Sequence, residues 1–196
     1  MQRLMDAARA LDSGAVAGIV RTMMAERGVA DVWTDVCVPA LCRLSEEDIV
    51  VEHVLAEGIA RGLDLVSAPR HDDIRTNHVL LACAPRESHS LPLRALAAAL
   101  FEHRVGTFML GAQVPWTALR AAVRRTVPGT AVVWAQTPAS ADAEALLAVA
   151  DRFPGTRFAA AGPGWGALPV ELPRLTSMDM AVSACTRVPA TLDMEA

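Results

Sequence analysis

The sequence predicts an α then α/β fold class, in which an N-terminal helical bundle precedes a parallel sheet with helices on both faces. Residues 1–66 space their apolar positions as helices do, and no strand pattern interrupts them. From residue 78 onward, short apolar segments alternate with helical stretches, which is typical of a parallel sheet. The polar stretch between these parts, residues 67–77, is expected to be a linker.

Short connections between the N-terminal helices predict an antiparallel four-helix bundle. Gly28 is expected to stop the second helix, and Pro39 to kink or divide the third. Ser45, followed by Asp48, resembles the capping arrangement that begins a fourth helix. The four helices are expected at residues 1–11, 12–28, 30–44 and 45–65.

The C-terminal part, residues 78–196, is expected to form a flavodoxin-like (Rossmann-like) domain. Strands joined by helices pair in parallel through right-handed crossovers, and five strands fit this doubly wound arrangement. The strands are expected at residues 78–84, 106–111, 131–136 and 157–162, with a last short one near 174–178. The helices are expected at residues 91–104, 115–125, 139–153 and 179–188.

The bulk composition excludes several classes of function. The chain is 53% hydrophobic with a mean hydropathy of +0.30, yet no apolar run reaches the roughly 18 residues of a membrane span. The N-terminus lacks a signal-peptide core, so a cytoplasmic location is expected. The net charge is −4 and no basic run is present, which argues against direct nucleic-acid binding. The four cysteines form no CxxC pair and are expected to be buried small hydrophobes.

A polar loop follows the first expected strand. The stretch RESHSLPL (residues 86–93) brings Glu87, Ser88, His89 and Ser90 to the edge where open α/β sheets bind ligands. His89 there is either a ligand to a metal or a solvated loop residue. Glu87 is either its partner or a carboxylate favoured by a helix N-terminus. No nucleophile lies beside a base in sequence, and no phosphate-binding loop is present, so hydrolase chemistry has no support.

These residues resemble cobalamin-binding modules, whose pattern is Asp-x-His-x-x-Gly after strand one, Leu-Gly after strand two, Ser-x-Leu after strand three and Gly-Gly after strand four. The corresponding stretches here are Glu87-Ser88-His89, Leu110-Gly111-Ala112, Trp134-Ala135-Gln136 and Gly162-Pro163-Gly164. Glu52-His53 in the expected bundle is similar to a pair in the sensory half of light-responsive MerR-type regulators. The resemblance covers nearly the whole chain.

The resemblance implies a cobalamin cofactor, adenosylcobalamin in the regulators, held between the bundle and the Rossmann-like domain. His89 would be the lower axial ligand of cobalt, and a carboxylate, Glu87, would hold its other ring N–H. The cofactor's nucleotide tail would enter a slot lined by small residues where strands three and four end. The cofactor-binding residues would be Glu87, Ser88, His89, Gly111, Ala112, Trp134, Gln136, Gly162 and Gly164, with Glu52 and His53 from the bundle.

Departures from the family pattern keep three functions open. Pro92 stands where the family has glycine, Trp134 where it has serine, and the bundle segment before Glu52 is shorter and lacks a tryptophan. The resemblance implies a non-enzymatic sensory protein in transcription control, with a homo-oligomer or a DNA-binding regulator as partner. The alternatives are an interaction module that has lost the cofactor, and a corrinoid carrier in methyl transfer, which would be the enzyme component.

Overall fold

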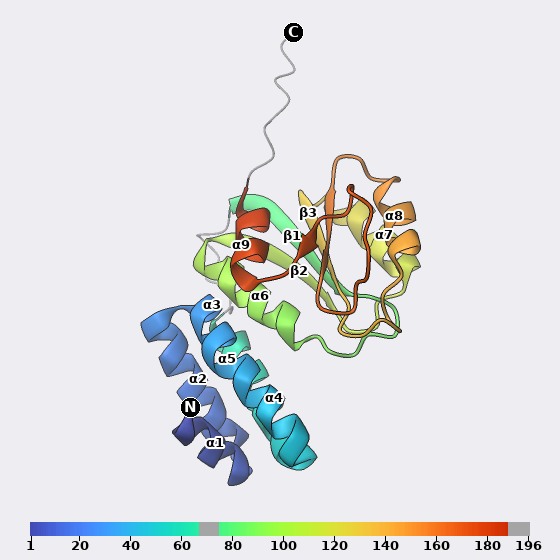
Figure 1. Ribbon diagram of the computed structural model, residues 1–196. Coiled ribbons are helices and arrows are strands. Elements are labelled where there is room, and N and C mark those ends of the chain that lie inside the picture. Colours follow the sequence, from blue (N-terminus) through green and yellow to red (C-terminus); the bar gives the residue numbers. More distant parts are fainter. Residues whose placement is uncertain (67–74, 188–196) are drawn as a thin grey trace. The chain divides into compact units, whose positions relative to one another are not determined.

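A computed structural model describes residues 1–66 and 75–187 (Figure 1). The chain divides into two compact units. The first comprises Met1–Ile74 and Ser90–Arg104, and the second comprises Arg75–His89 and Val105–Ala196. None of the helices in the described ranges is both long and apolar enough to cross a membrane.

The first unit is helical. Its elements are α1 (Gln2–Arg9), α2 (Ser13–Arg27), α3 (Val29–Val32), the π-helical turn η1 (Trp33–Cys37), α4 (Val38–Glu47), α5 (Ile49–Val66) and α6 (Leu91–Glu102). Gly28 ends α2 as expected, at a φ of +85°. The helix α6, which the sequence pattern places after the first strand, groups with these N-terminal helices.

The break expected at Pro39 is a π-helical turn within one continuous helical path from α3 to α4. The Val38 N–H donates to the carbonyl oxygen of Trp33, five residues back. Pro39 has no N–H, so it cannot bond the carbonyl of Asp35, and the wider turn accommodates its ring.

The prediction that Ser45 caps the fourth helix is wrong. Helix α4 continues to Glu47, and the residue that caps the next helix is Asp48. Asp48 is extended, and its carboxylate accepts hydrogen bonds from the N–H groups of Val50 (2.9 Å) and Val51 (3.2 Å). Asp48 thus supplies a side-chain acceptor for the free N–H groups at the start of the helix that follows. Helix α5 therefore begins at Ile49, four residues later than expected.

The core of the first unit lies where α2 and α5 cross at close range. A Cβ on Gly58 would overlap the side chain of Val16, and one on Gly62 would lie 3.1 Å from Val20. Helix α6 is held to this unit by polar contacts. Both carboxylate oxygens of Glu102 lie 3.1 Å from the Val29 nitrogen, whose N–H they accept, so Glu102 satisfies a donor at the start of α3.

The second unit is a five-stranded parallel sheet in the order β2-β1-β3-β4-β5, the flavodoxin-like order. The expected fold class is therefore confirmed. The strands are β1 (Arg75–Cys83), β2 (Val105–Gly111), β3 (Thr130–Trp134), β4 (Arg157–Ala161) and β5 (Arg174–Leu175). The helices are α7 (Trp116–Thr126), α8 (Ala143–Ala150) and α9 (Met178–Thr186).

Several boundaries differ from the expected ones. Residues 75–77, expected in the linker, belong to β1, while the rest of that linker, 67–74, lies outside the described residues. Strand β3 ends at Trp134 instead of Gln136. Helix α8 begins at Ala143 instead of 139, because the Asp142 carboxylate accepts the Ala145 N–H at 2.9 Å and caps the helix there.

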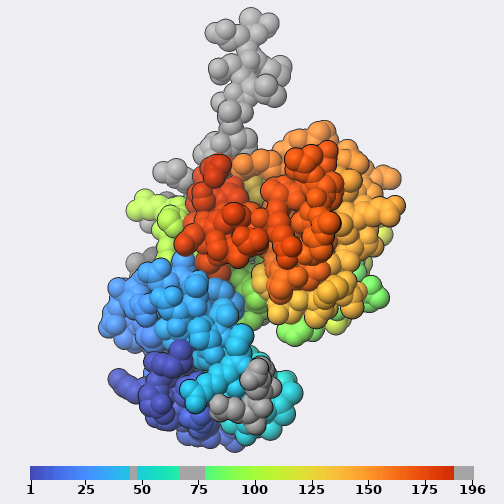
Figure 2. All heavy atoms as spheres, in the orientation of Figure 1, coloured from blue at the N-terminus to red at the C-terminus, as the bar shows by residue number. Residues whose placement is uncertain are grey.

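Both faces of the inner strands β1, β3 and β4 are buried, as their apolar sequences require. Helices α7 and α8 cover one face, and α9 lies on the other (Figure 1). The core under α7 and α8 contains Leu80, Ala82, Ala131, Val133, Phe158 and Ala160 from the strands, with Leu119, Val123, Leu146 and Val149 from the helices. The Arg157 guanidinium donates to the carbonyl oxygens of Ala184 and Arg187 and so ties β4 to α9. The chain from β4 to α9 forms a continuous part of this unit's surface (Figure 2).

Candidate functional site

The candidate site lies at the carboxyl edge of the sheet, where β1 and β3 end side by side. In a sheet of this order, this edge is where neighbouring connections diverge and ligands bind. The loop after β1 is fixed by its backbone: the Ala84 N–H donates to the carbonyl oxygen of Trp134 at 2.8 Å, and the Gln113 N–H donates to that of Glu87 at 2.8 Å. The loops after β1, β2 and β3 are thus joined at one place.

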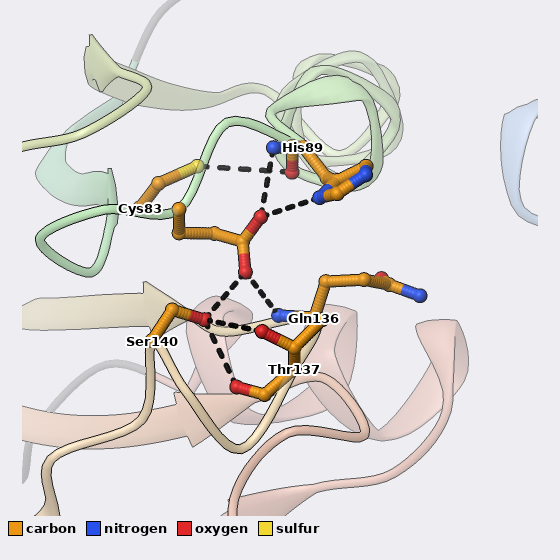
Figure 3. A network of polar contacts seen from close by, with 6 residues as sticks. Cys83, His89, Gln136, Thr137 and Ser140 are labelled. Carbon is orange, nitrogen blue, oxygen red and sulfur yellow. Dashed lines mark hydrogen bonds and ion pairs between the residues drawn. The ribbon is translucent and has the colours of Figure 1, made fainter.

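Glu87 is the centre of a polar network at this edge (Figure 3). Its side chain is only 2% exposed. One carboxylate oxygen, Oε1, accepts from the His89 backbone N–H (2.9 Å) and lies 2.6 Å from His89 Nδ1. The other, Oε2, accepts from the Gln136 N–H and the Ser140 hydroxyl, each at 2.6 Å. Both oxygens therefore have partners, as a buried charge requires.

The network keeps Glu87 ionised. Burial by itself raises the pKa of this carboxyl group, but hydrogen bonds from Ser140, His89 and Gln136 outweigh burial and lower the pKa to about 2. Glu87 is therefore a buried carboxylate at neutral pH. An ionised carboxylate can only accept hydrogen bonds, so it selects donors among its neighbours.

This charge orients the imidazole of His89. Because Glu87 accepts only, the proton between them belongs on Nδ1 of the neutral ring, which leaves the lone pair on Nε2. The His89 side chain is 60% exposed, and its second ring nitrogen lies on the side away from Glu87 (Figure 3). The geometry thus presents one basic nitrogen to a ligand beyond the edge, with a carboxylate behind it.

Cys83, the last residue of β1, contacts the backbone of His89. Burial, and then the negative charge of Glu87, raise the pKa of its thiol to about 12, so the group stays protonated. The thiol lies 3.8 Å from the carbonyl oxygen of His89, to which it donates. Cys83 is buried, as expected for all four cysteines; Cys37 and Cys185 are buried too, whereas Cys42 is exposed and departs from that expectation.

Four other expected site residues lie at the end of β2 or in the loops after β1, β2 and β3, and they differ in exposure and in what they contact. Gly111 ends β2 with a φ of +84°, and Ala112 after it is exposed, as is Ser88 beside His89. Gln136 contributes its backbone N–H to Glu87, while its side chain extends away from the carboxylate (Figure 3).

Gly162 and Gly164 allow two loops of the chain to approach each other. A Cβ on Gly162 would overlap the carbonyl oxygen of Ala135, and a Cβ on Gly164 would overlap that of Thr137. Gly162 also has a φ of +104°, which disfavours other residues. The loops after β3 and β4 thus pack backbone to backbone at these two glycines.

Trp134 is the last residue of β3, and its indole N–H is a buried donor without a hydrogen-bond partner among the described residues. The residue lies in register with Cys83 of β1 on one side and Ala161 of β4 on the other. Buried N–H groups without partners are rare in native structures, so this one calls for an explanation.

Glu52 and His53 belong to the first unit, at the start of α5. His53 is 73% exposed on its side chain, and its Nδ1 lies 3.0 Å from Glu52 Oε2 and 2.8 Å from the carbonyl oxygen of Ile49. The two residues thus contact each other and the helix that carries them.

Ser140 is the participant that the sequence pattern missed. Residues from 139 onward were expected to be helical, which would have placed Ser140 in the first turn of a helix. The signal that would have found it is Asp142: an aspartate cap there starts α8 at Ala143 and leaves Ser140 in the loop after β3. Its hydroxyl also lies 2.9 Å from the carbonyl oxygen of Thr137, within the same turn.

A single imidazole offers one bond to a metal, whereas structural zinc sites use four protein ligands. Among residues 1–66 and 75–187, no group of three or more His, Cys, Asp and Glu side chains is placed to hold a metal ion. At the described edge of the sheet, the residue that offers a free imidazole nitrogen to a ligand is His89.

Comparison with solved structures identifies the fold. The Methanosarcina barkeri monomethylamine corrinoid protein is similar over 93% of this chain and 95% of its own, with a TM-score of 0.71 and 9% sequence identity. The chain therefore shares the fold of that protein, a helical part followed by a five-stranded parallel sheet, which confirms the fold that the resemblance implied.

Two further structures give lower scores. The methanol:cobalamin methyltransferase complex MtaBC from Methanosarcina barkeri matches 92% of this chain and 76% of its own, with 15% identity and a TM-score of 0.49. A cobalamin-binding protein from Desulfitobacterium hafniense matches 93% and 95%, with 15% identity and a TM-score of 0.48. No protein-family model and no curated protein matches the chain.

Proposed function

We propose that this protein is a non-catalytic corrinoid-binding module in which His89 is an axial ligand of cobalt. The observation that carries the proposal is the 2.6 Å contact between His89 Nδ1 and the buried Glu87 carboxylate, at the ligand-binding edge of the sheet. A metal-bound histidine commonly donates its other ring N–H to a carboxylate, which fixes the tautomer and strengthens the ligand. A bound corrinoid would supply cobalt, its four ring nitrogens and carbon–cobalt chemistry.

The residues of the chain then have separate tasks. His89 provides the nitrogen, and Glu87 holds the imidazole in the tautomer that leaves Nε2 basic. Ser140 and the Gln136 N–H keep Glu87 charged and fixed in place. Both are positioning residues, since each acts on His89 only through Glu87.

Two roles suit such a module. In the sensory role, the protein would bind adenosylcobalamin in the cytoplasm and act with a second copy of itself or with a DNA-binding regulator. The Glu52-His53 pair supports this role. The carrier role, in which the module brings a corrinoid to a methyltransferase, is supported by the likeness to the monomethylamine corrinoid protein. Glu52, His53, Ser88, Gly111 and Ala112 remain proposed cofactor contacts in both roles.

The binding test uses the purified chain with hydroxocobalamin and with hydroxocobinamide, which is the same corrin without the nucleotide. The protein is mixed with each in the dark and desalted, and the visible spectrum of the protein fraction is recorded. A retained corrinoid is expected, with an absorption shift that His89→Ala abolishes.

The matched control is His103→Ala, which removes an exposed histidine after α6 and should leave the spectrum unchanged. Failure to retain either corrinoid would overturn the proposal, and so would a spectrum that is identical in the wild type and His89→Ala. Elution volume measured with adenosylcobalamin in the dark and after illumination then separates the roles: a change supports the sensory role, and constancy supports the carrier.

A further inference from the structure

At the carboxyl ends of β1, β3 and β4, the middle strand ends in a tryptophan that lies between two small residues. Trp134 pairs in register with Cys83 and Ala161, and Gly162 follows Ala161. Val133 faces the core under α7 and α8, so Trp134, one position on, lies on the opposite face of the sheet. The indole Cδ2 lies 3.1 Å from where a Cβ of Gly162 would be, so the ring extends over the end of β4.

The small residues at these strand ends pack against other parts of the same chain. Gly162 and Gly164 accommodate the backbone of Ala135 and Thr137, and the Trp134 indole also lies against Gly162. Tryptophan has the largest side chain, and indole has the same fused five- and six-membered ring skeleton as benzimidazole, the base of the cobalamin nucleotide. A base and this indole cannot occupy the same space.

We infer that Trp134 makes the chain selective for corrinoids that lack a nucleotide base, because its indole fills the space at the ends of β3 and β4. This inference rests on the proposed corrinoid function and concerns only which corrinoid is bound: it favours a corrinoid without the base over the adenosylcobalamin of the sensory role. The His89 end of the site fits a corrinoid, whereas the strand ends do not fit the base.

The buried indole N–H supports a space-filling role. With no acceptor for Nε1 among the described residues, the ring is held by packing and not by a hydrogen bond. Replacing the ring by a phenyl group therefore removes no hydrogen bond and relieves an unsatisfied donor. We therefore expect the preference between corrinoids to depend on an aromatic ring at position 134 and not on the indole N–H.

The test compares the affinities of the full chain for hydroxocobinamide and hydroxocobalamin by spectral titration. Wild type should bind cobinamide at least about tenfold more tightly. Trp134→Ser should abolish this preference by raising the affinity for cobalamin, whereas Trp134→Phe should retain the preference and bind cobinamide as wild type does. Trp116→Ser is the matched control, because Trp116 packs against the core under α7 and α8, and it should leave the preference unchanged.

The outcomes separate this inference from the proposed function. Binding of neither corrinoid overturns the proposed function, and the inference with it. Cobalamin bound as tightly as cobinamide by the wild type overturns the inference alone, as does an unchanged preference in a folded Trp134→Ser. Loss of cobinamide binding in Trp134→Phe would also overturn it, because the N–H would then be the important group. The wild-type comparison stands even where a variant fails to fold.

Discussion

Ser140 donates a 2.6 Å hydrogen bond to Glu87, although 53 positions separate the two residues in sequence. The contact joins the loop after β3 to the loop after β1 at the point where a sheet of this order binds ligands. Glu87 in turn lies 2.6 Å from Nδ1 of His89. The orientation of an exposed imidazole thus depends on a hydroxyl that never touches it.

Ser140→Ala should lower the free energy of unfolding of the second unit by about 2 kcal/mol, because a buried carboxylate loses a charge-assisted hydrogen bond. It should also weaken His89-dependent corrinoid binding without abolishing it, since the Gln136 N–H remains on the same oxygen. Urea unfolding followed by tryptophan fluorescence measures the first effect. Ser88→Ala, the same change at an exposed neighbour, should unfold as wild type does; equal midpoints for the two variants would contradict the role of Ser140.

Glu87 should make the stability of the ligand-free protein depend on acid pH. Its folded-state pKa of about 2 lies below the ordinary glutamate value of 4.5, so its contribution is complete above about pH 4.5 and is lost as the pH falls towards 2. The wild type should therefore lose about 3 kcal/mol relative to Glu87→Gln across this interval. Urea unfolding of both proteins at several pH values tests this, and parallel curves would show that Glu87 is not the group responsible.

The fold class was predictable from the sequence because it depends on local patterns. Helical spacing in the first part and alternating strands and helices in the second are each visible within a short window. The contact between Glu87 and His89 was likewise within reach, since two positions separate the residues and the family pattern pairs them.

The rest depended on contacts between distant residues. The role of Ser140 is set by a bond across 53 positions. Helix α6 belongs to the first unit through contacts between distant residues, among them the bond of Glu102 to Val29 across 73 positions. Neither leaves a local pattern. The start of α5 was misplaced for a different reason: Ser45 and Asp48 are both good caps, and only the extended backbone of Asp48 decides between them.

Gly162→Ala should destabilise the second unit more than Gly111→Ala. Both glycines have a positive φ, so alanine costs about 1 kcal/mol of backbone strain at either. At Gly111 nothing lies within 4 Å of the added Cβ, whereas at Gly162 it would overlap the Ala135 carbonyl oxygen. We expect a further loss of about 2 kcal/mol or more for Gly162→Ala, measured by urea unfolding. Equal losses in the two variants would mean that the loops after β3 and β4 separate freely.

In the first unit, glycine-to-alanine changes should have opposite signs on two facing helices. Gly18 of α2 has nothing within 4 Å of an added Cβ, so alanine should stabilise the helix by about 1 kcal/mol through its higher propensity. Gly58 of α5 gains the same propensity, but its Cβ would overlap Val16 and lie 2.9 Å from the Ser13 carbonyl oxygen. Helices α2 and α5 would have to separate, and overpacking of this kind costs about 1–3 kcal/mol. Urea unfolding followed by far-ultraviolet circular dichroism should show Gly18→Ala above and Gly58→Ala below wild type. A Gly58→Ala variant as stable as Gly18→Ala would refute the close crossing, because propensity alone would then account for both changes.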